Sequence, residues 1–309
     1  MKEFELISRL TQDLPTHREV VVGPGDDCAV LDVGLPDRLL LFKTDAVVEG
    51  VHYPPGTAAE KVGRKALARC LSDIAAMAGT PTAALITLAL PAKYDLDFVD
   101  GIYRGIAALA REHGVAIAGG ETTTNPGRIL LSVSLLGWSE RDRAILRSGA
   151  QAGDAIFVTG KLGGSIAGKH LDFEPRLAEA RWLAQHFKVH AMIDLSDGLA
   201  GDLPHILKAS GVGADLLASA IPISREARLT ARDHPGKPAL AAALSDGEDF
   251  ELLFTLASRA AVPVVDAWKK QFPSLPLSCI GKITKEPGIR LRDKYGVRPL
   301  NANGYVHLT

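Results

Sequence analysis

The apolar segments of this chain fall into two sets, and a polar, turn-rich stretch at residues 139–153 lies between them. Each set mixes short strand-like segments with amphipathic helical segments, and the two kinds do not alternate strictly. Strict alternation is typical of a doubly wound parallel sheet, so the mixture favours an α+β fold. The 309 residues suffice for two domains of ordinary size, which we predict at residues 1–140 and 141–309.

The clearest helical segment of the first set covers residues 58–78. Its apolar side chains recur at helical spacing, namely Leu67, Cys70, Leu71, Ile74 and Met77. A second helix is expected at residues 97–113, and strands are expected at residues 30–31, 39–43, 83–90, 115–118 and 129–136. In the second set we expect strands at residues 155–159, 191–193, 252–255 and 277–280, and helices at residues 175–187 and 203–210.

Charge and cysteine content exclude several classes of protein. The 35 Lys and Arg residues nearly balance the 36 Asp and Glu residues, and the formal net charge of −1 argues against a nucleic-acid partner. The longest strongly apolar stretch, residues 83–90, is too short to cross a bilayer, so no membrane partner is expected. Cys28, Cys70 and Cys279 are odd in number and lack CxxC spacing, which favours free thiols and a cytoplasmic location.

Acidic residues recur at glycine-containing turns and at the ends of strands, and one more lies on the first predicted helix. The turn and strand-end positions are Asp27, Asp45, Glu121, Asp194 and Asp197, and the helical one is Asp73. Glycine lets backbone segments approach closely, so such turns can bring carboxylates to a common point. Several carboxylates together with Ser or Thr oxygens form a site that suits Mg²⁺ rather than zinc. Because such sites also bind phosphates, the pattern indicates phosphoryl transfer and a site that is strongly anionic when empty.

Each of these positions also has a purely structural interpretation. An Asp beside a Gly is ordinary turn chemistry, because the side chain accepts hydrogen bonds from nearby backbone amides. Asp73 could pair with Arg69 one helical turn earlier, and residues 196–198 could form the entry to a helix. The metal interpretation therefore depends on whether the acids converge in the folded chain.

Two other motifs are set aside. Residues 163–170 follow a strand and nearly spell the phosphate loop GxxxxGK[ST], but His170 lacks the hydroxyl that would hold Mg²⁺. His186 and His190 stand four residues apart without the glutamate of an HExxH motif, so we expect a solvated or a core pair.

Eight short segments occur in an order that points to one enzyme family. They are GPGDDCAVL, TDAVVEGVHY, LSDIAAMAG, AGGETT, RSGAQAGD, VTGKLGGSIAG, DLSDGL and GEDFEL. With these segments the chain resembles the thiamine-monophosphate kinases over nearly its whole length. The resemblance implies two α+β domains of the type found in aminoimidazole ribonucleotide synthetase, with an N-terminal domain that forms a barrel in a homodimer.

The resemblance also implies a reaction and its residues. Mg²⁺-dependent transfer of the γ-phosphoryl group of ATP to thiamine monophosphate would give thiamine diphosphate and ADP. The positions that match metal ligands are Asp27, Thr44, Asp45, Asp73, Glu121, Asp194 and Asp197. Those that match nucleotide contacts are Tyr103, Gly120, Glu121, Arg147 and Ser196, and those that match contacts to thiamine monophosphate are His52, Glu248 and Tyr305. The acceptor phosphate is already a nucleophile at neutral pH, so no catalytic base is expected, and Arg147 would stabilise charge.

Four departures from the family pattern bear on the site. Glu121 stands where the family has Asp. Lys43 replaces a Ser before the Thr-Asp pair, and its ammonium could replace the charge of one metal ion or could point away. Asp246 replaces a Gly, and residues 304–308 also differ, both near the expected thiamine pocket. Two alternatives therefore stay open, namely a related ATP-dependent phosphotransferase with another acceptor and a nucleotide-binding homologue without turnover.

Overall fold

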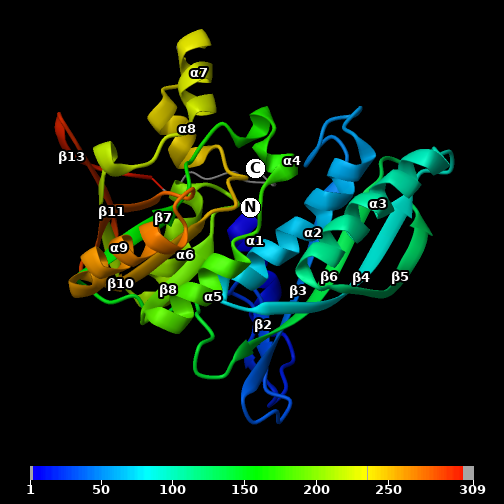
Figure 1. Cartoon of the computed structure of the whole chain (residues 1–309), viewed down its shortest axis with the longest axis horizontal. Coiled ribbons are helices and arrows are strands. Elements are labelled where there is room, and N and C mark those ends of the chain that lie inside the picture. The colour runs from blue at the N-terminus through cyan, green and yellow to red at the C-terminus, as the bar shows by residue number, and fades with distance from the viewer. Residues whose placement is uncertain (1–2, 235, 302–309) are drawn as a thin grey trace.

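The computed structural model describes residues 3–234 and 236–301, which form two units around two separate sheets (Figure 1). The N-terminal unit runs to the end of a strand at Glu140, and the second unit contributes its first strand from Asp154. Both units mix helices and strands, so the predicted α+β class is confirmed. Within the described ranges, none of the helices is both long enough and apolar enough to cross a bilayer.

The N-terminal sheet has the strand order β1-β2-β3-β6-β4-β5. β4 pairs with β5 in parallel, and the other neighbours pair antiparallel. The elements of this unit are α1 (Glu3–Thr11), β1 (Val20–Val22), β2 (Ala29–Leu31), β3 (Arg38–Val48), α2 (Ala59–Ala76), β4 (Thr80–Leu90), α3 (Leu96–His113), β5 (Ala116–Thr124) and β6 (Leu130–Glu140).

α2 and α3 cover one face of this sheet. The side chains of its central strands therefore alternate between buried and more exposed positions. Ile86 of β4 and Val133 of β6 are buried on the helix side. Phe42 and Leu85 lie on the opposite face and remain about half exposed. Every residue of the edge strand β5 is exposed as well. This unit therefore leaves one face and one edge of its sheet uncovered within the chain.

Glycines bring α2 and α3 into direct backbone contact. A Cβ atom at Gly63 would lie 1.9 Å from the carbonyl oxygen of Ile102, and one at Gly105 would lie 2.0 Å from the carbonyl oxygen of Glu60. Only glycine permits so close an approach at these two positions. α2 is thereby held against α3 and the sheet, while it also contacts α5 and β8 of the second unit.

The C-terminal sheet has the strand order β13-β12-β9-β11-β7-β10-β8. β12 pairs with β9 in parallel, and the other neighbours pair antiparallel. The strands are β7 (Asp154–Thr159), β8 (Val189–Asp194), β9 (Gly213–Leu217), β10 (Leu252–Ala257), β11 (Leu277–Thr284), β12 (Gly288–Asp293) and β13 (Gly296–Pro299). The helices are η1 (Ser165–Ala167), α4 (Lys169–Asp172), α5 (Leu177–His186), α6 (Leu199–Ser210), η2 (Ala218–Ala220), α7 (Arg225–Asp233), α8 (Ala239–Ser245), η3 (Ser258–Ala260) and α9 (Ala261–Gln271).

Helices cover both faces of the second sheet. α6 and α8 share a core with Val158 and Ile193, whereas α5 and α9 share a core with Phe157 and Phe254. Phe157 and Val158 are neighbours on β7, so the two cores lie on opposite faces. The core under α5 and α9 continues into the N-terminal unit and includes Leu71 of α2. The two units therefore share one apolar interior.

The predicted elements all occur, but several bounds were wrong and several elements were missed. The strand predicted at residues 115–118 continues through Gly119 and Gly120 to Thr124, because its parallel pairing with β4 continues past the glycines. β12 was missed because its buried Ile289 and Leu291 alternate with charged residues and form no apolar run. The sequence analysis also did not predict α1, β1, β9, β13, or the helices α4, α7, α8 and α9.

Candidate functional site

Three buried carboxylates meet where the two units touch, and we call this group the acidic centre. It consists of Asp27, Asp73 and Asp194, each of which offers an oxygen within 4.8 Å of the other two. Asp27 precedes β2, Asp73 lies on α2, and Asp194 is the last residue of β8. All three are at most 6% exposed. The turn and strand-end motifs of the sequence thus converge on one point from both units.

Burial makes the ionised form of these carboxylates costly. It raises the pKa of Asp194 to about 7, with the charge of Asp27 adding to the effect. The pKa of Asp73 is also raised, by burial and by Asp194, although Lys43 opposes the change. Oδ2 of Asp27 is buried without a hydrogen-bond partner among the described residues. Converging oxygen ligands, one of them unpartnered, are the donor set that fits Mg²⁺.

Three cations of the chain lie around the acidic centre. Lys43 Nζ is 2.8 Å from Oδ1 of Asp73, and Arg147 Nη2 donates a hydrogen bond of 2.7 Å to Oδ1 of Asp27. Arg69 Nε lies 3.4 Å from Oδ2 of Asp45, so the alternative in which Arg69 pairs with Asp73 is wrong. With Asp45 included, four carboxylates face three cations. The site is thus far less anionic than its acids alone suggested.

Arg147 keeps an unpartnered atom beside the acidic centre. Its Nε is buried and lacks a hydrogen-bond partner among the described residues, whereas the Nε of Arg69 belongs to the ion pair with Asp45. The backbone amide of Arg147 also donates to Oδ2 of Asp26 at 3.0 Å. Buried polar groups normally find partners. The unpartnered Nε of Arg147 and the unpartnered Oδ2 of Asp27 therefore suit a ligand that carries both anionic groups and cations.

A cavity of about 440 Å³ lies between the two units, and its lining includes Arg69 and Ser196 but none of the three carboxylates of the acidic centre. The N-terminal unit contributes His52 and Arg69, of which Arg69 also pairs with Asp45. The C-terminal unit contributes polar groups from three segments, namely Ser196, Asp197, Lys237, Asp246 and Glu248. Apolar lining comes from Ile166, from α7 and α8, and from Phe250. The cavity can therefore hold an organic molecule with an apolar body and charged groups.

Lys65 of α2 fixes two of the cavity-lining segments. Its side chain is fully buried, bonds to Oε2 of Glu248, and donates to the backbone oxygen of His52 at 2.6 Å. The backbone amide of Val48 donates to Nδ1 of His52 at 3.0 Å, so the second ring nitrogen carries the proton in the neutral form. Glu248 adopts a φ of +54°, a strained conformation for a non-glycine residue. This network links the two units across the cavity.

Residues 163–170, which resemble a phosphate loop, already donate their first backbone amides to carboxylates of the chain. The amide of Gly163 donates to both carboxylate oxygens of Asp249, and the amide of Gly164 donates to Asp246. Lys169 Nζ bonds to Glu251 at 2.8 Å. The loop therefore has no free amides for a phosphate at these positions, which agrees with its rejection from the sequence.

Several predicted site residues lie away from the acidic centre. Neighbouring residues of a strand point to opposite faces, so Thr44 faces away from Asp45, and its hydroxyl lies 3.3 Å from Ser132 Oγ. Gly120 and Glu121 lie on the edge strand β5, and Tyr103 lies on α3. Figure 1 shows this edge on the far side of the N-terminal unit from the second unit. One chain does not bring these residues to Asp27, Asp73 and Asp194.

The remaining predicted residues border the cavity or fall outside the described ranges. Ser196 and Asp197 line the cavity, and the backbone amide of Asp197 donates to the buried Asp202. Tyr305 lies outside the described residues. Reasoning from the sequence missed Lys65, Arg69 and Ser72 as site residues; Ser72 donates to Asp194 at 2.6 Å. The signal available was their position on the same helix as Asp73.

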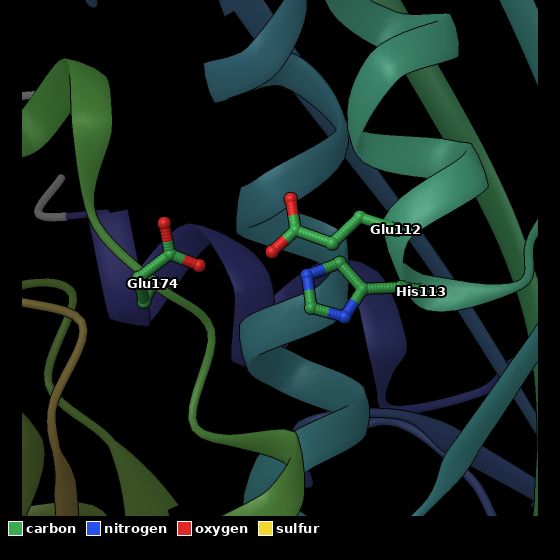
Figure 2. A group of neighbouring side chains, drawn as sticks. All are labelled: Glu112, His113 and Glu174. Carbon is green, nitrogen blue, oxygen red and sulfur yellow. The ribbon is translucent and has the colours of Figure 1, made fainter.

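A second group of possible ligands lies at the end of α3. Figure 2 shows Glu112 and His113 of this helix facing Glu174, which lies in the segment after α4. Arg64 bonds to Glu174 and approaches Glu112 to 4.0 Å. The two acids thus already share a cation, and both are exposed. Of the two groups that the described residues form, only the acidic centre consists entirely of buried residues.

The histidine pair set aside from the sequence has ordinary structural partners. His186 ends α5, and its Nδ1 lies 2.8 Å from the carbonyl oxygen of Trp182. His190 lies on β8, and its Nδ1 is 2.8 Å from Oδ2 of Asp154. The two side chains belong to different elements and different networks. They therefore form no metal site of the HExxH kind.

Comparison with protein families assigns both units. Residues 25–139 match the AIR synthase related protein, N-terminal domain, and residues 151–294 match the AIR synthase related protein, C-terminal domain. The two units are therefore domains of the AIR synthase related class. The thiamine-monophosphate kinase of Rhodopirellula baltica is 42% identical over 287 residues, which cover 90% of this chain and 87% of that protein. The chain belongs to the thiamine-monophosphate kinase family.

Solved structures agree with this assignment. A structure described as AaThiL complexed with AMPPCP and TMP superimposes with a TM-score of 0.82 at 28% identity and covers 99% of this chain and 97% of that chain. Thiamine-monophosphate kinase from Stenotrophomonas maltophilia superimposes with a TM-score of 0.74 at 33% identity, covering 94% and 96%. The whole described chain thus follows the fold of these kinases.

Proposed function

We propose that this protein transfers the γ-phosphoryl group of ATP to thiamine monophosphate, giving thiamine diphosphate and ADP. One observation carries the proposal: Asp27, Asp73 and Asp194 form a buried carboxylate group, with an unpartnered oxygen, where the two domains meet. Family membership supports the same reaction, because the relatives are named for it. AaThiL has been solved with AMPPCP and TMP, which are the two kinds of ligand that this site requires.

Mg²⁺ is part of the proposal, and the acidic centre would hold it. When bound, Mg²⁺ neutralises charge on phosphates and so reduces the repulsion between donor and acceptor. Arg147 is anchored by Asp27 and Asp26, which leaves its buried Nε to donate to a phosphate oxygen. Such a pre-positioned donor stabilises the charge that spreads over the transferred group. A phosphate oxygen of the acceptor attacks the γ-phosphorus while the bond to ADP breaks, and no base is needed.

The cavity is proposed to hold the thiamine part of the acceptor. The thiazolium ring is cationic, and carboxylates of Asp197 and Glu248 line the cavity. Phe250 and the alanines of α7 and α8 offer apolar surface for the two rings. His52 lines the N-terminal side of the same cavity, close to Arg69, where the acceptor phosphate would turn towards the acidic centre. This orientation places the phosphate between Arg69 and the carboxylates.

A product assay tests the reaction. Purified protein is incubated with ATP, Mg²⁺ and thiamine monophosphate, and thiamine diphosphate is measured by chromatography, with Asp73→Asn as the inactive control. We expect thiamine diphosphate from the wild-type protein and none from Asp73→Asn. ATP turnover only with another phosphorylated acceptor would favour a related phosphotransferase, for which the Asp246 carboxylate at the cavity would be the reason. Tight nucleotide binding without turnover would identify a non-catalytic homologue.

We also propose a homodimer in which one chain completes the site of the other. The uncovered face with Phe42 and Leu85, and the exposed edge strand β5, are the surfaces that a partner would cover in the barrel expected for the family. Gly120 and Glu121 on β5 would then reach the acidic centre of the partner rather than their own. This arrangement would also bring Thr44 and Glu121 to the same buried interface.

A mixed dimer tests this arrangement. One chain carries Asp73→Asn and the other carries Glu121→Ala, and differently tagged copies are coexpressed and purified as the heterodimer. If Glu121 acts across the interface, one intact site remains and about half of the wild-type activity is expected. If Glu121 acts within its own chain, the heterodimer is as inactive as both parents. Sedimentation that shows a monomer would overturn the dimer itself.

The remaining expectations stay part of this proposal. Residues 1–140 would carry the metal site and the dimer contacts, and residues 141–309 would complete the nucleotide and acceptor sites. Cys28, Cys70 and Cys279 are free thiols in the structure, which supports the cytoplasmic location expected from the sequence. ATP and thiamine monophosphate are the proposed small-molecule partners.

A further inference from the structure

Lys43 lies beside the acidic centre, and the reaction proposed above gives it no role. It lies on β3 two residues before Asp45, so both side chains point to the helix side of the sheet. Its ammonium is 2.8 Å from Oδ1 of Asp73, and the side chain is only 21% exposed. The sequence left open whether Lys43 points away from the site. The structure places it inside.

The Lys43 ammonium binds a carboxylate oxygen of Asp73 that a divalent ion would otherwise bind. Mg²⁺ binds carboxylate oxygens at about 2.0–2.1 Å and demands octahedral geometry. Oδ1 of Asp73 already accepts a charged hydrogen bond from Lys43, so this oxygen points at a cation of the chain. Asp27 Oδ2, by contrast, is unpartnered and remains available.

We propose that Lys43 fills one cation position of the acidic centre, so that this chain binds one divalent ion fewer there than it would with an oxygen-bearing side chain at position 43. The inference rests on the proposed function, because it requires the acidic centre to bind metal. It assigns Lys43 a positioning role: the ammonium holds Asp73 in place and supplies a fixed charge. A serine at this position would supply an oxygen ligand and no charge.

The number of bound metal ions tests this role directly. Mn²⁺ replaces Mg²⁺ as the probe. The protein is titrated with Mn²⁺ in the presence of a non-hydrolysable ATP analogue, and free Mn²⁺ is measured by electron paramagnetic resonance. We expect Lys43→Ser to bind one Mn²⁺ per chain more than the wild type. Lys43→Arg keeps the cation and should keep the wild-type number. Lys61→Ser removes an exposed lysine that pairs with Asp172 on the surface, and it should also leave the number unchanged.

Each outcome decides the inference. An unchanged number in Lys43→Ser overturns it, most clearly if the KM for ATP rises at the same time, because Lys43 would then contact a phosphate instead. If Lys43→Ser does not fold, Lys43→Gln keeps more of the side-chain volume and offers an oxygen, and the same extra ion is expected. If the wild-type chain binds no Mn²⁺ and makes no thiamine diphosphate, the proposed function fails. A wild-type chain that is active while the number in Lys43→Ser stays the same refutes only the role of Lys43.

Discussion

Asp194→Asn should make the metal-free protein more stable at pH 8 while it abolishes turnover. Asp194 is 4% exposed, and its pKa rises from 3.8 in the unfolded chain to about 7 in the folded one. A folded pKa above the unfolded value means that the ionised group opposes folding. The cost is absent below pH 4, grows between pH 4 and pH 7, and is constant above pH 7. A difference of about 3 in pKa corresponds to about 4 kcal/mol at pH 8. An amide oxygen at this position still accepts the hydrogen bond from Ser72.

The assay is urea unfolding in EDTA at pH 8 and at pH 4, with the midpoint and slope measured for both proteins. The gain for Asp194→Asn should be up to about 4 kcal/mol at pH 8 and should vanish at pH 4. Added Mg²⁺ should stabilise the wild type more than the variant, because the variant lacks one of the three carboxylates of the acidic centre. Asp172→Asn, on an exposed acid, serves as the control and should change stability by less than about 0.5 kcal/mol. A variant that is less stable than the wild type at pH 8, or equally altered at both pH values, would refute the reasoning.

Three further predictions follow from the same geometry. Asp73→Asn should lower kcat by about 100-fold or more with an unchanged circular dichroism spectrum, because it removes a carboxylate of the acidic centre. Glu121→Asp should keep activity within about tenfold of the wild type, because the charge remains and the family carries Asp there. Gly63→Ala should lower the free energy of unfolding by about 2 kcal/mol or more, because its Cβ would lie 1.9 Å from the oxygen of Ile102.

A specific result would contradict each of these three predictions. Wild-type turnover in Asp73→Asn would remove that residue from the metal site. An inactive Glu121→Asp enzyme would mean that the geometry of this site requires the longer side chain of glutamate. An unaltered urea midpoint in Gly63→Ala, measured beside Gly127→Ala at a glycine with open space around it, would mean that α2 and α3 can separate without cost.

The residues of the acidic centre were predictable because carboxylates at turns and strand ends form a recognisable pattern. Their convergence was not, since Asp27, Asp73 and Asp194 meet only through the packing of two domains. Strand alternation would have separated Thr44 from Asp45 and placed Lys43 beside Asp45, so this part of the geometry was present in the sequence. Lys65 and Arg69 escaped notice because a basic residue on an amphipathic helix normally faces solvent, whereas here Lys65 pairs with Glu248 of the second domain and Arg69 with Asp45 of its own domain.

The apolar interior shared by the two domains has a consequence for the movement of ligands. Swinging the domains apart would expose the packing between α2 and α5 and would break the buried Lys65–Glu248 pair. The shared core and this ion pair oppose such an opening, so we expect the two domains to move as one body. Both α7 and α8 line the cavity, but α8 packs into the core with α6, whereas α7 buries only Ala227 and projects from the molecule in Figure 1. We therefore expect acceptor entry and product release to depend on movement of α7 rather than on a hinge between the domains.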